Sequence, residues 1–179
     1  KKTKLNKKII GIGESGLDFY YNHSDKKDQI KCFEEHIDAA QITQLPLIVH
    51  TRDAENETVD ILKKKLKIKD FKILIHCFTG SKKFAFDLLD IGAYISASGV
   101  ITFKKSSDLA NTFKEIPNER ILVETDAPYL APVPLRGKPN EPSYIIHTIK
   151  FLSKIKNLSF EEFSKITTEN FFKLFGKLN

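Results

Sequence analysis

Four side chains of the kind that bind divalent metals each follow a short apolar segment of this sequence. They are Glu14, His50, His76 and Asp126. Carboxylate oxygens and imidazole nitrogens are common ligands of the metal ions that activate water for hydrolysis. The sequence therefore predicts a metal-dependent hydrolase, provided that the fold brings these four side chains to one place.

The apolar segments themselves have the length and the branched side chains of strands that are buried on both faces. With one further segment that carries no ligand, we expect five strands, at Ile9–Ile12, Leu47–Val49, Lys72–His76, Ala93–Ala97 and Ile121–Glu124. In this arrangement the candidate ligands cluster at the carboxyl ends of the strands.

Between and after the strands, apolar residues recur at three- and four-residue spacing, as on the buried face of a helix. We expect helices at Lys27–Gln44, around Val59–Leu66, from Ser81 to Gly92, at Asp108–Glu115, around Ile145–Leu152 and around Phe163–Phe171. Ser81 and Ser143 are suited to cap helices, and Ser159 with Glu162 forms a capping-box pattern. A loop rich in proline joins the last strand to the last two helices.

Strands that alternate with helices predict an α/β fold with a parallel sheet. An open sheet would hold the ends of distant strands too far apart to share an ion, whereas a barrel brings them around a common centre. We therefore expect a TIM (β/α)8 barrel of the metallo-dependent hydrolase type. A whole barrel needs about 250 residues. We expect an incomplete barrel of about five βα units that lacks its N-terminal strands, with residues 1–179 forming a single domain.

Each candidate ligand also has an ordinary structural interpretation. Glu14 could begin a helix, and Asp126 could form an Asx turn before Pro128. A histidine that follows apolar residues is commonly a core residue, so neither His50 nor His76 is convincing alone. Their recurrence at the same place in consecutive βα units, together with two acids, favours a shared metal site.

Residues beside the ligands suggest supporting roles. Glu124 could orient a metal ligand through a hydrogen bond. Arg52 and Arg136, in a chain with few arginines, are candidate forks for a phosphate or carboxylate of the substrate. Salt bridges to Asp53 or Glu141 are the alternative for the two arginines.

The remaining histidines and the two cysteines give weaker signals. His23 lies in a loop near the first candidate ligand and is a weak candidate, while His36 and His147 look structural. Cys32 and Cys77 provide no disulfide framework, which fits a reducing cytosol and a cytoplasmic protein. No apolar run approaches the roughly 20 residues of a membrane helix, and no signal peptide is visible.

Charge and composition add two expectations. The net charge is +6. A polyanionic partner would explain the excess of lysine, but we favour the simpler explanation of a solvated, lysine-rich surface. The sequence contains no methionine and opens with KKTKLNKK directly before an apolar strand. We therefore expect a fragment that lacks its N-terminus.

Four motifs, in this order along the chain, resemble those of the TatD-type metal-dependent deoxyribonucleases. The motifs are GIGESGLDFYY, PLIVHTRDA, HCFTGS and LVETDAPYLAPVPLRGKPNEP. The resemblance extends from about Ile9 to Phe175. It implies a TIM barrel with two divalent ions, of which Glu14 would bridge both, His50 and His76 would hold the second, and Asp126 would help hold the first. The His-x-His pair that the family carries on its first strand is not present before Ile9.

The resemblance further implies hydrolysis of DNA phosphodiesters by water that two divalent cations (Mg2+, Zn2+ or Mn2+) activate, with Asp126 as the general base. Such an enzyme would be a deoxyribonuclease, of exonuclease type, with DNA or another phosphoester as its partner and no membrane or obligate protein partner. Two alternatives stay open. One is a metallohydrolase of the same fold that acts on a small ester or amide, and the other is a non-catalytic, truncated remnant.

Overall fold

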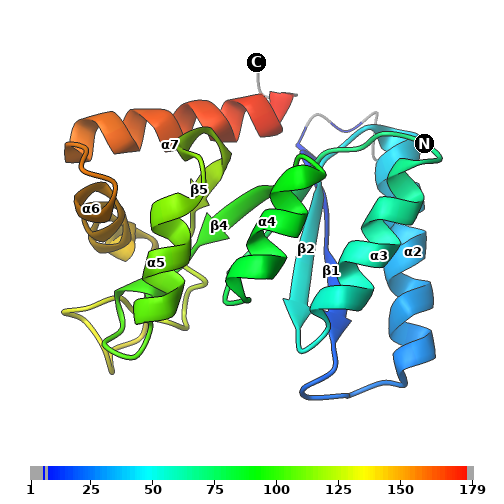
Figure 1. Cartoon of the computed structure of the whole chain (residues 1–179), viewed down its shortest axis with the longest axis horizontal. Coiled ribbons are helices and arrows are strands. Elements are labelled where there is room, and N and C mark those ends of the chain that lie inside the picture. Colours follow the sequence, from blue (N-terminus) through cyan, green and yellow to red (C-terminus); the bar gives the residue numbers. More distant parts are fainter. Residues whose placement is uncertain (1–5, 7, 177–179) are drawn as a thin grey trace.

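A parallel sheet of five strands forms the centre of the protein (Figure 1). The computed structural model describes residue 6 and residues 8–176. In these residues the strands are β1 (Ile12–Asp18), β2 (Leu47–Arg52), β3 (Ile73–Ile75), β4 (Tyr94–Ala97) and β5 (Ile121–Val123). Each strand pairs with the next one along the chain. All the strand carboxyl ends therefore lie at one edge, the lower edge of Figure 1.

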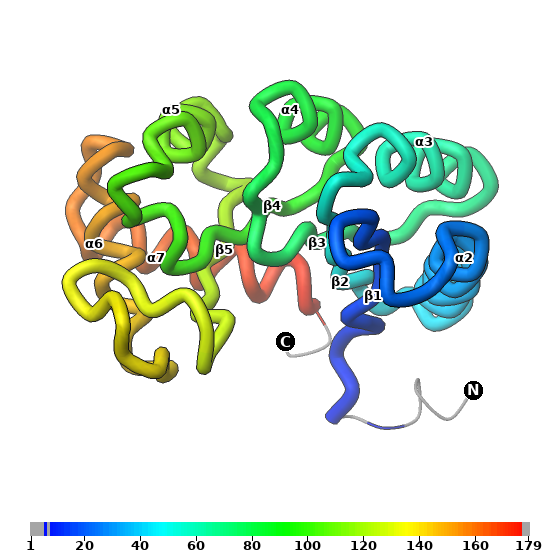
Figure 2. The backbone as a smooth tube through the Cα atoms, turned by 90° about the horizontal axis from the view of Figure 1, so that it is seen from below, coloured from blue at the N-terminus to red at the C-terminus, as the bar shows by residue number. Residues whose placement is uncertain are grey.

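Helices cover one side of the strands, so that the chain forms an arc that is open on its other side (Figure 2). These helices are α2 (Lys26–Thr43), α3 (Glu55–Leu66), α4 (Lys82–Asp90), α5 (Ser107–Glu115) and α6 (Ile145–Ile155). Three short 3-10 helices, η1 (Gly99–Thr102), η2 (Asn118–Arg120) and η3 (Pro142–Tyr144), lie between them. The expected order of strands and helices is confirmed, with ends that differ by a few residues. Among the described residues, no helix has the length and apolar character needed to cross a membrane.

The last helix, α7 (Phe160–Leu174), lies across the amino ends of the strands, away from the candidate ligands (Figure 1). The side-chain amide of Asn170, which is 1% exposed, donates 2.8 Å hydrogen bonds to the carbonyl oxygens of Asn118 and Ile121. The ammonium group of Lys72 donates to the carbonyl oxygens of Lys173 and Leu174, at the end of the helix. These hydrogen bonds hold α7 against the amino ends of the strands.

The two faces of the strands pack against different partners. Outward residues such as Val49, Ile75 and Ile95 are fully buried against the helices in the main hydrophobic core. Inward residues near the amino ends, including Leu74 and Leu122, pack with the end of α7 in a second, smaller core. Further along the same inward face, polar residues replace apolar ones. The inward face is therefore apolar at the amino ends of the strands, called the floor below, and polar at their carboxyl ends, called the mouth. The same division occurs in a barrel whose site lies at the carboxyl ends.

The predicted position of the first strand, Ile9–Ile12, was wrong. The strand runs from Ile12 to Asp18, because pairing with β2 begins at Ile12 and continues past Glu14. The apolar residues before it contact the floor of the arc instead, where Ile10 packs with the second core. The sequence was misleading because the strand itself consists largely of polar residues and glycine, whereas the apolar residues lie before it.

One extra residue interrupts the regular pairing of β1 with β2. Ile12 is opposite Leu47 and Ser15 is opposite Val49, so three steps along β1 match two steps along β2. Such a bulge changes the face on which the following side chains lie. It places Glu14 on the inward face. At Gly16 the two strands are so close that a Cβ atom would lie 1.8 Å from the carbonyl oxygen of His50, so only glycine fits.

Two of the three predicted helix caps are confirmed. Ser81 accepts a hydrogen bond from the backbone N–H of Phe84, and Ser159 and Glu162 form a complete capping box. The cap predicted at Ser143 was wrong, because this residue lies within η3 and its hydroxyl donates to the carboxylate of Glu141. The proline-rich segment permits a 3-10 turn there before α6 begins.

Candidate metal centre

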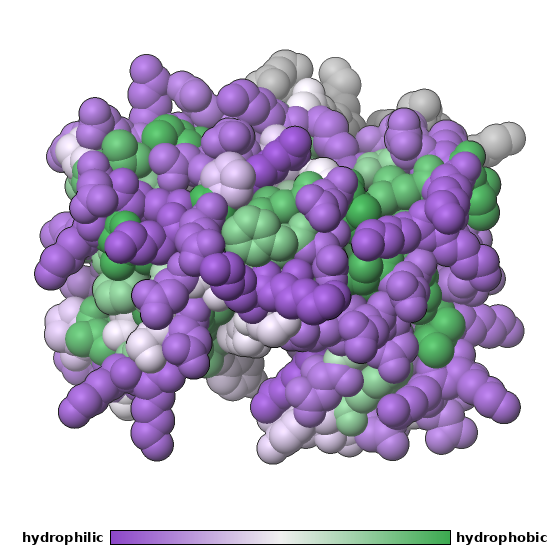
Figure 3. Space-filling model, in the orientation of Figure 1, coloured by the Kyte–Doolittle hydropathy of each residue, from purple (hydrophilic) through white to green (hydrophobic). Residues whose placement is uncertain are grey.

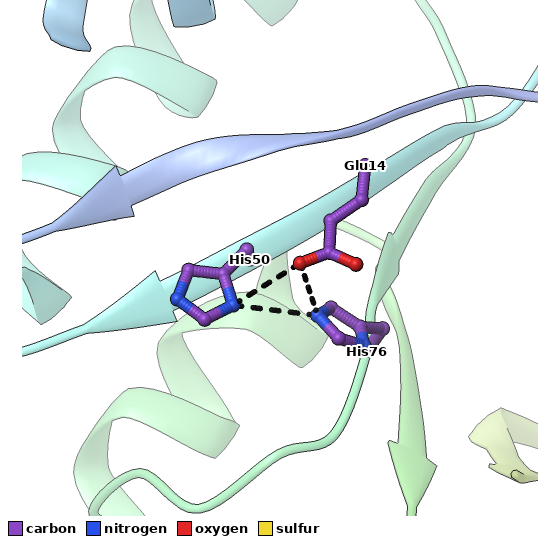
Figure 4. Close-up of side chains that lie close together, drawn as sticks. All are labelled: Glu14, His50 and His76. Atoms are coloured by element: carbon purple, nitrogen blue, oxygen red, sulfur yellow. Dashed lines mark hydrogen bonds and ion pairs between the residues drawn. The ribbon is translucent and has the colours of Figure 1, made fainter. Parts of the chain in front are cut away.

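Three candidate ligands from three adjacent strands meet at the mouth of the arc (Figure 4). One carboxylate oxygen of Glu14 lies 3.1 Å from Nε2 of His76 and 3.4 Å from Nδ1 of His50. The same two ring nitrogens are 3.4 Å apart. Parallel pairing in register explains this meeting, since Val49 is opposite Ile75 and each histidine follows directly.

These separations suit a divalent metal. Three donor atoms about 2.1 Å from one tetrahedral centre would be about 3.4 Å apart, and octahedral geometry would bring neighbours to about 3.0 Å. The three observed separations lie between 3.1 and 3.4 Å. The donor set, two imidazole nitrogens and a carboxylate oxygen, is one that zinc and manganese accept.

His76 also belongs to a second group of possible ligands. Its Nδ1 atom lies 3.3 Å from a carboxylate oxygen of Glu124, and candidate ligand atoms of His76, Glu124 and Asp126 all lie within 4.8 Å of one another. Burial lowers the pKa of His76, but the hydrogen bond and negative charge of Glu124 outweigh it and raise that pKa above its ordinary value. The contact with Glu124 directs Nε2 of His76 toward Glu14.

Glu124 is held in its charged form. Burial tends to raise its pKa, but hydrogen bonds with His76 and Ser96 dominate, and the pKa is lowered. For Asp126, by contrast, burial and the neighbouring Glu124 raise the pKa. The predicted last strand reached Glu124, whereas β5 ends at Val123. A left-handed backbone at Asp126 (φ 58°) brings it back beside the same histidine.

Asp18 is a site residue that sequence reasoning missed. One of its carboxylate oxygens lies 3.2 Å from Nε2 of His50, on the side of the ring opposite Glu14. Burial tends to raise the pKa of Asp18, but hydrogen bonds from the Tyr21 amide and from His50 lower it. A carboxylate in this place fixes the ring orientation of a metal-binding histidine. The signal was its even spacing from Gly16 and Glu14, which becomes visible only once the strand is known to reach Asp18.

The two arginines lie at the mouth but outside the ligand groups. The guanidinium of Arg52 lies 4.0 Å from the ring centre of Tyr20, and that of Arg136 lies 3.7 Å from the ring centre of Phe103. Within the residues that the structure describes, neither arginine forms an ion pair, so the predicted alternative of salt bridges to Asp53 or Glu141 was wrong. Both guanidinium groups are exposed.

The arc of parallel strands, with carboxylates and imidazoles gathered at its carboxyl end, defines the class as a partial (β/α)8 barrel of the metallohydrolase type. The model of the family "TatD related DNase" matches residues 1–176. The chain belongs to this family.

Known relatives support the same assignment. An uncharacterized metal-dependent hydrolase of Buchnera aphidicola subsp. Acyrthosiphon pisum is 45% identical over 98% of this chain and 66% of its own length. The uncharacterized metal-dependent hydrolase YcfH of Escherichia coli strain K12 is 42% identical over 93% of this chain and 63% of its own. The crystal structure of YjjV, a TatD homolog from Escherichia coli K12, superposes with a TM-score of 0.86 at 25% identity, over 94% of this chain and 64% of that one.

These comparisons confirm the predicted family and the predicted fold class. The chain spans slightly less than two thirds of the length of the relatives that it matches. The metal-binding roles of Glu14, His50, His76 and Asp126 stay predictions that the observed geometry makes specific.

Proposed function

We propose that the protein is a hydrolase that cleaves phosphodiester bonds of DNA with water activated by divalent metals. The observation that supports this most strongly is the meeting of Glu14, His50 and His76 beside a second group that contains Asp126. Membership of the TatD-related DNase family supports the same chemistry.

In this proposal Glu14, His50 and His76 would hold one divalent ion, and Asp126 and Glu14 would help to hold a neighbouring one. Mg2+, Mn2+ and Zn2+ are all compatible with these donors. When bound, two such ions would lower the pKa of a water molecule and stabilise negative charge on the phosphoryl oxygens. Glu124 keeps His76 in the required tautomer, because its carboxylate accepts the proton on Nδ1.

Asp126 accepts the proton of the attacking water as the general base. Its carboxylate is partly buried at the carboxyl end of the arc and lies within reach of His76. The exposed guanidinium groups of Arg52 and Arg136, each of which lies over an aromatic ring, would contact phosphate oxygens of the substrate.

The test is hydrolysis of an oligonucleotide by the protein with Mn2+, with and without EDTA. We expect EDTA to abolish hydrolysis and Asp126→Ala to lower kcat at least about 100-fold, as is typical for loss of a general base. Asp108→Ala, which removes an exposed acid from the first turn of α5, should leave kcat unchanged.

Activity that survives EDTA or Asp126→Ala would contradict the proposed chemistry. Faster turnover of simple esters or amides than of oligonucleotides would favour a small-molecule hydrolase of the same fold. Metal binding without any turnover would favour a non-catalytic remnant.

A further inference from the structure

We propose that the loop after β1 carries a stacking site for an unpaired nucleobase next to the metal centre. This inference rests on the proposed function, because it identifies residues that would hold the nucleotide whose phosphate is cleaved. The four residues of the site, called the stacking cluster below, are Tyr20, Tyr21, His23 and Arg52.

The stacking cluster is a continuous set of ring and guanidinium contacts. The rings of Tyr21 and His23 lie parallel within 3°, with centres 5.5 Å apart. Tyr20 meets Tyr21 edge-on at 4.9 Å. The guanidinium of Arg52 lies 4.0 Å from the centre of Tyr20 and 4.7 Å from that of Tyr21. Rings and guanidinium planes are the groups on which bases of single-stranded nucleic acid stack.

The cluster is exposed, although aromatic rings ordinarily gain stability by burial. Tyr20 is 58% exposed and Tyr21 is 55% exposed. Its backbone is nevertheless held firmly. A carboxylate oxygen of Asp18 accepts hydrogen bonds from the amides of Tyr20 and Tyr21, and the side chain of Gln29 bonds to both the N–H and the carbonyl of Asp18. A rigid support for exposed rings is what a preorganised binding surface needs.

Asp18 also links the cluster to the candidate metal centre. The oxygen that does not support the tyrosine amides lies 3.2 Å from Nε2 of His50. A cavity of about 490 Å³ adjoins this contact, and its lining includes Glu14, His50, Tyr21 and His23. Ligand cavities of about 300–1,000 Å³ hold small organic molecules, so this space is large enough for one nucleotide.

The cavity is lined both by Glu14 and His50 and by Tyr21 and His23, so a nucleotide bound in it through a metal ion would also contact the stacking cluster. The space-filling view shows the molecule hollowed at this end, where the strands terminate (Figure 3). A base must be unpaired to present its face to a ring, so the site would favour single-stranded over duplex ends.

The test uses a short oligothymidylate that carries one 2-aminopurine, whose fluorescence falls when it stacks. Titration of the Asp126→Ala protein with Mn2+ measures stacking with the metal in place and with hydrolysis slowed. In this background we expect quenching when Tyr21 is intact and with Tyr21→Phe, which keeps the ring. Tyr21→Leu should lose the quenching and raise the KM for the oligonucleotide about 10-fold.

Tyr94→Leu is the matched control. Tyr94 lies at the amino end of β4 and also has an arginine over its ring. It therefore provides the same contact between a ring and a guanidinium group, but at the end of the sheet away from the candidate metal centre. This variant should quench like the unaltered protein. If the unaltered protein hydrolyses the oligonucleotide but Tyr21→Leu quenches and turns over equally well, the stacking inference alone is overturned. If the unaltered protein neither binds nor hydrolyses any oligonucleotide, the proposed function fails as well.

Discussion

His50 is in contact with acids through both of its ring nitrogens. Nδ1 faces Glu14, and Nε2 lies 3.2 Å from Asp18. A metal-binding imidazole whose second nitrogen is fixed in this way has its orientation and tautomer set before the metal arrives. Asp18 is therefore important because it fixes the orientation and the tautomer of His50.

Asp18→Asn should weaken the binding of Mn2+ or Zn2+ by about 10- to 100-fold, the usual effect of losing the partner of a metal-binding histidine. Asparagine keeps an oxygen for the amides of Tyr20 and Tyr21, so the loop should stay in place. Isothermal titration calorimetry measures the affinity. Asp25→Asn, which changes an exposed acid that makes no side-chain cap for α2, serves as the control. Equal affinities in the two variants would show that Asp18 does not position His50.

The sequence predicted which residues belong to the candidate site better than it predicted their contacts. His50 and His76 stood out because they recur at the same place in consecutive βα units, and Glu14 stood out together with them. Asp18 did not stand out, since the strand was placed too early and Asp18 fell in an apparent loop. The left-handed turn at Asp126 could not be predicted either, because it depends on how the following loop packs against the sheet.

At the scale of elements, the capping box of α7 shows how strongly local sequence acts. Ser159 accepts from the N–H of Glu162, and Glu162 in turn accepts from the N–H of Ser159. Ser159→Ala should lower the free energy of unfolding by about 1 kcal/mol. Ser106→Ala is a close control, because Ser106 occupies the same position before α5 without making a side-chain cap. Urea denaturation compares the two, and equal losses would count against the capping role.

The capping box also predicts a pH dependence. Hydrogen bonds from Ser159 lower the pKa of Glu162 in the folded protein. A lowered pKa means that the contribution of Glu162 to stability is present above the ordinary carboxyl range and is lost as pH falls through the folded pKa. Glu162→Gln should therefore lower the melting temperature at pH 7 and have little effect near pH 3. A melting-temperature difference that persists unchanged at pH 3 would contradict this assignment.

The attachment of α7 depends on one buried amide. Asn170→Ala would leave the carbonyl oxygens of Asn118 and Ile121 without their hydrogen-bond donor, and we expect a loss of about 2 kcal/mol. Glu169→Ala, at the exposed neighbouring position, should change stability by only about 0.5 kcal/mol or less. Chemical denaturation measures both variants. Nothing in the sequence pattern distinguished Asn170 from the other polar residues of the helix, because its partners lie about fifty positions away.

For the whole molecule, the candidate centre should couple metal binding to folding. Its ligands come from three different strands, so an unfolded chain cannot present them together. Mn2+ or Zn2+ at 100 times its dissociation constant should add about 2.7 kcal/mol to the free energy of unfolding. Calorimetry should show the melting temperature rising with metal for the unaltered protein and for His147→Ala, and staying constant for His76→Ala. A similar rise in all three would indicate binding elsewhere.

The architecture of the whole molecule could be predicted because it depends on repetition. Alternating strands and helices predict a parallel sheet, and several ligands at equivalent strand ends predict curvature toward one centre. What could not be predicted is the depth at which each side chain lies along its strand. This depth depends on the stagger between neighbours, and β5 pairs with β4 so that Leu122, rather than Glu124, is opposite Ser96.

The extra residue in β1 has a consequence for how such a sequence can change. Loops at the rim can grow or shrink while the ladder of paired strands stays fixed. Between Ile12 and Ser15, however, the number of residues decides on which face of the sheet each following side chain lies. A change that let the pairing continue from Ile12 without the bulge would set Glu14 opposite Val49 and turn its carboxylate toward the helical layer, so a slip of one residue that is too small to unfold the sheet would still remove a ligand.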